Sequence, residues 1–390
     1  MSLSRRTVLR AGGSLMVAGV AAGGLAGLAN LGLTAAAGPT ASAEGRLRIG
    51  YLPITDAAPL LVAHGRGLYD QHNLAVAQPV LFRGWAALAE AFVTRQVDVV
   101  HILMPMALQL QATVYPGARM LAWNHTGGSA VTVAPHITDL RQLAGTQVAI
   151  PGWWSIHNIV LQKMLRGADL RPVIRQPASA AENTVELVVM APSDMVPALA
   201  GGSIAGYTVA DPFNAAAEAR GVGRIHRFLG DVWRDHACCV LLTHADFIEE
   251  RPVAVQSLTD SVVAGQRLIG ADRAAAAATL TDGGYLPQPG PVVATALDYP
   301  AGAHPAAHPQ WQPHQIGFSP FPFPSYTEAL VEEMRQTVVD GDTRFLNVPA
   351  SQVHDRLVDD RFVRSAIERT GGPGAWGLSP DLTRTEEIAG

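Results

Sequence analysis

The chain has 390 residues, a formal net charge of −5 and 48% hydrophobic residues. This length is sufficient for one large domain or for two lobes that each bury a core. The acidic balance argues against nucleic acid as a partner.

The first 43 residues are typical of an export signal. Arg5 and Arg6 form a twin-arginine pair ahead of an apolar stretch over residues 11–37, and residues 41–43 give the small-residue pattern of a cleavage site. A membrane anchor is the less favoured interpretation, because glycine and alanine dominate the stretch and no basic stop follows it. Removal of this segment would shift the formal charge to −8, since it holds three arginines and no acidic residue.

A strand is predicted over residues 47–52, and a helix is predicted from about Pro59. Thr55 and Asp56 lie between them. The first amides of a helix lack partners within the helix and attract negative charge, so we predict that a small oxyanion binds at this turn. The alternative is an ordinary turn in which Asp56 caps the helix.

Trp85 opens the next predicted helix, in which apolar residues repeat with helical spacing as far as Val93. Trp85 is either the first core residue of this helix or a wall of a ligand site. The apolar run over residues 97–103 is typical of a buried parallel strand.

A glycine-rich segment at residues 123–129 precedes a strand predicted over residues 130–133. Its glycines permit a tight turn or a close approach of backbone to ligand. After a strand at residues 147–150, Ser155 is predicted to cap a helix. His157 lies in its first turn, where the helix dipole disfavours the protonated ring, so a neutral His157 could donate a hydrogen bond to an anion. A capping or packing role is the alternative.

Two further junctions complete the pattern. Ser193 is predicted to cap a helix over residues 195–200, and Asp211 and Pro212 follow a strand over residues 207–209. Parallel strands place their carboxyl ends at the same edge of a sheet. We therefore expect these turns to form one ligand site.

Cysteine and histidine give no predicted metal site. Cys238 and Cys239 are adjacent, and such a pair closes only a strained disulfide, so we predict two thiols buried in a strand. A metal or redox role would need more ligands than this pair supplies. The proline-rich residues 284–324 carry histidines at 304, 308 and 314, but no carboxylate or cysteine pattern completes a site, which favours a surface loop. No cofactor is predicted, and residues 371–390 are predicted to be a frayed tail.

Eight segments spread over nearly all of the chain after the signal resemble the solute-binding proteins of nitrate, bicarbonate and sulfonate ABC importers, most closely the nitrate and bicarbonate branch. These segments are residues 54–60, 85, 101–106, 124–132, 151–158, 211–214, 233–236 and 320–326. The resemblance implies an α/β fold of the type II periplasmic-binding kind, with ligand held between two lobes. Lobe one would comprise residues 46–134 and 243–390, and lobe two residues 135–242, with crossovers near 133–136 and 240–244.

The resemblance also implies ligand-binding residues. Nitrate-binding relatives hold the anion with a tryptophan, a glutamine, a histidine and a cation. Trp85 and His157 match the tryptophan and the histidine, whereas Ser129 replaces the glutamine and leaves more room. Arg234 falls at the position of the cation, which favours a nitrate-like oxyanion or a larger anion such as an alkyl sulfonate. The predicted site also includes the turn residues Thr55, Asp56 and Asp211.

We therefore predict an exported, monomeric solute-binding component of an ABC importer, which captures a small anion and delivers it to a membrane permease. The sequence shows no set of nucleophile, base and orienting group, so we predict that it is not an enzyme. Two alternatives stay open. One is a sensor that binds the same ligand. The other is an enzyme, since the fold also resembles iron-dependent pyrimidine-precursor synthases of thiamine biosynthesis, which use histidine and a cysteine-rich stretch, as in His236, Cys238 and Cys239.

Overall fold

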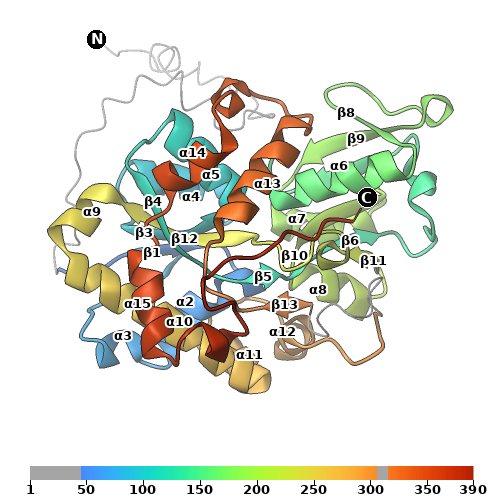
Figure 1. Ribbon diagram of the computed structural model, residues 1–390. Coiled ribbons are helices and arrows are strands. Elements are labelled where there is room, and N and C mark those ends of the chain that lie inside the picture. Colours follow the sequence, from blue (N-terminus) through green and yellow to red (C-terminus); the bar gives the residue numbers. More distant parts are fainter. Residues whose placement is uncertain (1–44, 305–314, 390) are drawn as a thin grey trace, which may run out of the picture.

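The structure is a computed structural model that describes residues 45–304 and 315–389 (Figure 1). The predicted export signal lies outside the described residues, as do His308 and His314. Within the described ranges, no helix has the length and apolar character needed to cross a membrane.

The first of two large sheets has five strands. Their order is β2 (Val80–Leu81), β1 (Ile49–Tyr51), β3 (Val99–Leu103), β12 (Cys239–His244) and β4 (Ala118–Trp123). Strands β1, β2 and β3 run parallel, while β12 lies antiparallel between β3 and β4. Every residue of β1, β3 and β12 is buried, as the unbroken apolar run over residues 97–103 predicts.

Helices cover both faces of this sheet (Figure 1). They come from two segments of the chain, residues 58–113 and 245–369. Helix α10 packs against α2, α3 and α15, and α13 packs against α14. The helices are α2 (Ala58–Gly65), α3 (Leu68–Gln71), α4 (Trp85–Val93), α5 (Met104–Thr113), α9 (Ala245–Glu250), α10 (Pro252–Ala271), α11 (Arg273–Asp282), α12 (Gly290–Leu297), α13 (Pro324–Arg335), α14 (Ala350–Leu357) and α15 (Arg361–Arg369).

The second sheet has six strands and is built from one stretch of chain. Their order is β11 (Arg224–Phe228), β6 (Ser129–Val133), β10 (Gly206–Ala210), β7 (Gln147–Ile150), β9 (Thr184–Val189) and β8 (Arg171–Val173). The helices that contact it are α6 (Ile156–Gly167), α7 (Pro192–Ala200) and α8 (Phe213–Ala219). A small third sheet pairs β5 (Thr126–Gly127) with β13 (Ile316–Gly317).

The chain passes between the two large sheets twice. We call residues 124–128, between β4 and β6, the first passage, and residues 229–238, between β11 and β12, the second passage. Both passages precede the crossovers predicted near 133–136 and 240–244. Strand pairing is the reason, because β6 is bonded to β10 and β11, while β12 is bonded to β3 and β4.

Local sequence signals account for several elements. The predicted strand over residues 147–150 coincides with β7, and the predicted cap of α6 is confirmed, since the Ser155 hydroxyl accepts from the Asn158 backbone N–H at 3.1 Å. The predicted cap at Ser193 is wrong. Helix α7 begins at Pro192, whose fixed φ suits the first helical position, and no side chain caps it.

The prediction of a frayed tail is also wrong. The end of the chain runs along the second passage, where the Ala389 N–H donates to the Val232 carbonyl at 2.7 Å and the Arg234 N–H donates to the Glu387 carbonyl at 3.0 Å. The indole N–H of Trp233 donates to a carboxylate oxygen of Glu386 at 3.0 Å. Hydrogen bonds to residues 232–234, which include the buried Trp233, therefore hold this polar tail in place.

Candidate functional site

The turn after β1 meets the turn after β10 between the two sheets. Both the backbone N–H and the hydroxyl of Thr55 donate to the Asp211 carbonyl oxygen, at 2.8 and 3.0 Å. Both residues are buried. The two turns therefore meet, as expected, but they do so across two sheets and not at the edge of one, and the Thr55 amide here bonds to protein backbone.

Asp56 lies in a short 3₁₀ helix, Thr55–Ala57, and does not cap α2, which begins at Ala58 without a side-chain cap. Its carboxylate lies 2.9 Å from Nε2 of His125, a residue of the first passage, and both side chains are fully buried. Burial raises the pKa of Asp56 to about 6. Burial lowers the pKa of His125, but the nearby Asp56 outweighs this effect and raises it to about 10. The two groups are therefore an ion pair at neutral pH.

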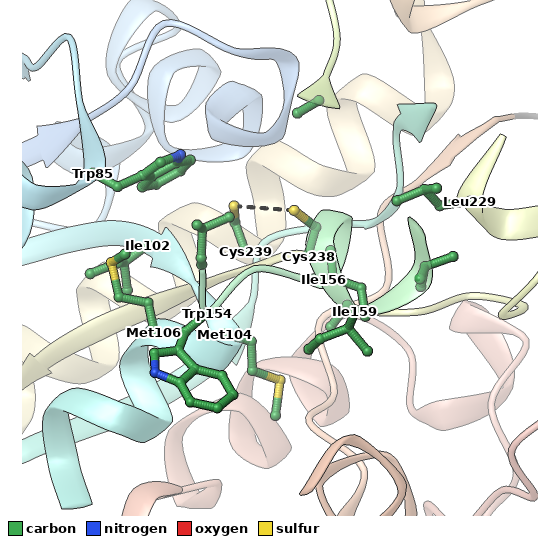
Figure 2. Close-up of a cluster of buried hydrophobic side chains, with 14 of the residues drawn as sticks. Trp85, Ile102, Met104, Met106, Trp154, Ile156, Ile159, Leu229, Cys238 and Cys239 are labelled. Atoms are coloured by element: carbon green, nitrogen blue, oxygen red, sulfur yellow. Dashed lines mark hydrogen bonds between the residues drawn. The ribbon is translucent and has the colours of Figure 1, made fainter. Parts of the chain in front are cut away.

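The two cysteines lie beside this pair. Cys238 ends the second passage and Cys239 begins β12, and both are free and completely buried, as predicted. Their sulfur atoms, which face each other in Figure 2, lie 3.6 Å apart. The sulfur of Cys239 also lies 3.6 Å from a carboxylate oxygen of Asp56. The thiols, the carboxylate and the imidazole therefore form one buried polar cluster.

The second sheet contributes Ser129 and His157 to the edge of this cluster. Nε2 of His157 lies 2.9 Å from the Ser129 hydroxyl and 3.9 Å from the Cys238 sulfur. His157 is in the first turn of α6, as predicted, while its Nδ1 has no partner among the described residues. Ser129 and His157 are thus a bonded pair, with one ring nitrogen of His157 unused.

Trp85 begins α4 and is 4% exposed (Figure 2). Its ring packs against His101 of β3, with the ring centroids 5.7 Å apart. No hydrogen-bond acceptor among the described residues faces the Trp85 indole N–H, and both ring nitrogens of His101 also lack partners there. Burial lowers the pKa of His101 to about 3, so its ring is neutral. Trp85 is therefore a core residue that also offers an unused donor.

Asp211, which follows β10 of the second sheet, is a buried acid whose carboxylate has several hydrogen-bond partners. The Tyr299 hydroxyl donates to both of its carboxylate oxygens, at 3.0 and 2.9 Å, and the Ala215 N–H donates to one of them at 3.1 Å. Burial nevertheless raises the pKa of Asp211 to about 7. This side chain is fixed by its own partners, and its contact with Thr55 is made through the backbone.

The structure does not bring Arg234 to the others. Its guanidinium bonds to Glu387, at 3.1 and 3.2 Å, and lies 3.6 Å from the Asp235 carboxylate. Its side chain is 30% exposed, whereas the other predicted ligand residues are buried. A role for Arg234 in anion binding stays a prediction.

Sequence reasoning missed the roles of His125, Cys238 and Cys239 in the cluster. His125 lies within the glycine-rich segment for which we predicted a tight turn or a close approach to a ligand, and that segment does bend sharply, with φ of +66° at Gly127 and +77° at Gly128. The polar residues of the first passage were therefore the signal in the sequence that could have pointed to a site at His125. The partners of His125, Asp56 and Cys239, lie 69 and 114 residues away along the chain, so its role was not visible as a motif.

The geometry now permits comparison with known proteins. The family model of the NMT1-like family matches residues 40–281. The chain belongs to the NMT1-like family. Among curated proteins, the nitrate/nitrite binding protein NrtA of Synechococcus elongatus is 24% identical over 247 residues, which are 56% of this chain and 53% of that protein. The chain spans about a third to a half of the length of the curated relatives that it matches.

Two solved structures show that this NMT1-like chain has the fold of periplasmic binding proteins. The nitrate-binding protein NrtA of Synechocystis PCC 6803 aligns with a TM-score of 0.73 at 18% identity, covering 88% of this chain and 93% of that one. The aliphatic sulphonate binding protein SsuA of Escherichia coli aligns with a TM-score of 0.55 at 18% identity, covering 75% and 86%. The predicted two-lobed fold and the family resemblance are confirmed.

Proposed function

We propose that this chain is the exported solute-binding component of an ABC importer, and that it captures a small anion between its two sheets for delivery to a membrane permease. Support comes from the relatives and structural neighbours, which are nitrate-, nitrite- or sulfonate-binding proteins. Export by the twin-arginine route and a location outside the cytoplasm are part of this proposal. So are the monomeric state and the choice of binding over catalysis.

The observation that carries the proposal is a pair of unused donors, one on α4, which packs on the first sheet, and one on α6, which packs on the second. The Trp85 indole N–H and Nδ1 of His157 are buried without partners in the described structure. Buried donors without acceptors are costly, and a small oxyanion supplies acceptors. Since Arg234 is bonded elsewhere, the anion would be held by neutral donors, with Ser129 bonded behind His157.

Thermal unfolding of residues 44–390 tests the proposal. Nitrate, nitrite, bicarbonate with and without calcium, taurine, alkyl sulfonates and thiamine precursors would each be added to chelator-treated protein. A ligand at a hundred times its dissociation constant stabilises the protein by about 2.7 kcal/mol. We expect one anion to raise the melting temperature, and the shift to disappear in Trp85→Ala and in His157→Ala.

The matched control is Arg344→Ala, whose side chain is 86% exposed and which should keep the full shift. If none of the anions acts and a thiamine precursor does, the transport proposal fails and the enzyme alternative takes its place. Export is tested separately by fractionating cells that produce the Arg5→Lys, Arg6→Lys variant. We expect it to stay in the cytoplasm, and its normal export would overturn the twin-arginine route.

A further inference from the structure

We propose that Asp56, His125, Cys238 and Cys239 bind one thiophilic divalent cation of the Zn²⁺ class. The four side chains each offer one ligand atom, and these atoms all lie within 4.8 Å of one another. Thiolate sulfur, imidazole nitrogen and carboxylate oxygen are the ligands that Zn²⁺ takes in proteins. This proposal goes beyond anion capture and stands on the side chains of the cluster alone.

The spacing of the ligand atoms is close to that of a tetrahedral site. With Zn–S bonds of about 2.3 Å and Zn–N or Zn–O bonds of about 2.0 Å, a tetrahedron has edges of about 3.8 Å between two sulfurs, 3.5 Å between sulfur and oxygen, and 3.3 Å between nitrogen and oxygen. The corresponding distances are 3.6 Å between Cys238 and Cys239, 3.6 Å between Cys239 and Asp56, and 2.9 Å between His125 and Asp56. These three edges differ from the ideal ones by a few tenths of an ångström, and the other three edges of the four-ligand set lie within 4.8 Å.

Bonding within the cluster is incomplete without a cation. Oδ1 of Asp56 is completely buried and has no partner among the described residues. Nε2 of His125 has one bonding position, yet it faces both the Asp56 carboxylate at 2.9 Å and the Cys239 backbone N–H at 3.2 Å. A carboxylate needs a donor from this nitrogen, whereas an N–H needs an acceptor. With a cation bound between His125 and Asp56, the Asp56 carboxylate would no longer need a proton donated by Nε2 of His125.

The four ligands come from segments that are far apart in the sequence, so a bound cation would link different parts of the fold. Asp56 follows β1, His125 belongs to the first passage, Cys238 belongs to the second passage and Cys239 begins β12. A bound cation would therefore fix the two passages to each other and to the first sheet. His157 lies just outside this set, 3.9 Å from the Cys238 sulfur.

Cobalt is a spectroscopic probe for such a site. Residues 44–390, stripped with a chelator under reducing conditions, would be titrated with Co²⁺ and then with Zn²⁺. We expect a thiolate-to-cobalt charge-transfer band and the visible bands of tetrahedral Co²⁺, both saturating at one ion per chain and both lost on addition of Zn²⁺. X-ray absorption of the Zn²⁺ form should give two sulfur and two lighter scatterers. Absence of sulfur from this shell would overturn the proposal without any variant.

Variants locate the ion. Cys239→Ser and His125→Gln should each remove the charge-transfer band or weaken Zn²⁺ binding beyond the roughly 100-fold that loss of an outer-shell partner costs. The matched control is His304→Ala, because His304 pairs with Glu218 at 3.0 Å nearer the surface and could hold an adventitious ion. An unchanged band together with unchanged Zn²⁺ affinity in Cys239→Ser, or a band that disappears in His304→Ala, contradicts the proposed site. Since anions are tested on chelator-treated protein, failure of either proposal leaves the other unaffected.

Discussion

Thr55 and Asp211 join the two large sheets through one carbonyl oxygen, which accepts from both the amide and the hydroxyl of Thr55. Thr55→Val keeps the side-chain shape and the amide bond but removes the hydroxyl donor. We expect it to lower the free energy of unfolding by about 1 kcal/mol, the usual net contribution of one hydrogen bond. Chemical denaturation measures this change.

Thr94→Val is the control for that prediction. The Thr94 hydroxyl donates at 2.7 Å to the Glu90 carbonyl at the end of α4, where water can replace it. We expect a loss below about 0.5 kcal/mol. If the two variants lose the same free energy of unfolding, the hydrogen bond between Thr55 and Asp211 contributes no more to stability than an exposed one.

Gly265 is expected to be irreplaceable in the contact between α10 and α2. A Cβ at this position would lie 2.5 Å from the Pro59 carbonyl oxygen, which is backbone and cannot rotate away. Gly265→Ala should therefore destabilise the protein by about 1–3 kcal/mol through overpacking. In the same helix, Gly270 has open space around it, so Gly270→Ala should stabilise by about 0.5–1 kcal/mol. Urea denaturation should therefore give changes of opposite sign in the free energy of unfolding for the two variants.

His244 is expected to make the protein sensitive to acid. Its ring stacks on Phe92 with centroids 4.2 Å apart, Nδ1 lies 3.1 Å from the Tyr115 hydroxyl, and Nε2 lies 3.3 Å from the Val97 carbonyl. Arg95 donates to the Tyr115 hydroxyl at 2.8 Å, so this hydroxyl can in turn donate to a neutral ring. The arrangement suits an imidazole without charge.

Burial chiefly lowers the pKa of His244 to about 4; nearby Arg95 also lowers it, whereas Asp246 and Asp98 act in the opposite direction. Because folding lowers this pKa, the proton binds more tightly to the unfolded chain. The stability that the neutral ring contributes is therefore complete above about pH 6.5 and is lost as the pH falls towards 4, by about 3 kcal/mol in all. His244→Gln should flatten the unfolding profile between pH 6.5 and 4, while the exposed His136→Gln should leave it unchanged.

Arg384 should be the residue through which the tail contributes to stability. Its guanidinium lies 5.0 Å from the ring centre of Trp123 and 4.7 Å from that of Phe323, and it forms two 2.8 Å bonds with Glu386. Arg384→Ala should cost about 2 kcal/mol, since cation–π contacts and a charged hydrogen-bonded pair are lost together. Differential scanning calorimetry would show the lower melting temperature, and an unchanged value would restore the idea of a loose tail.

Local signals predicted what depends on neighbouring residues. The Ser155 cap, the strand at residues 147–150 and the position of His157 all follow from short-range patterns. The contact between Thr55 and Asp211 does not follow from the rule for strand ends within one sheet, since β1 and β10 belong to different sheets. The cluster could not be predicted in this way. His125 meets Cys239 because β12 returns between β3 and β4, and nothing in the residues around Cys239 specifies that pairing.

The predictions for Arg234 and for the tail missed the structure for the same physical reason, which is contact with residues far away in the sequence. Arg234 matches a cation position in sequence, but a tail more than a hundred residues later supplies Glu387 as its partner. A polar tail also has the composition of a frayed end, and tertiary contacts with Trp233 override that tendency.

The position of β12 also sets the order in which the protein can be made. The second sheet is complete once residue 228 has been synthesised, whereas β3 and β4 wait for their shared neighbour until residue 244. During that interval two apolar strands have open edges on a nascent chain, a state that invites pairing with other chains. The exposure begins when β4 is complete at residue 123 and lasts until residue 244, so slow synthesis anywhere in this interval would prolong the need for a chaperone.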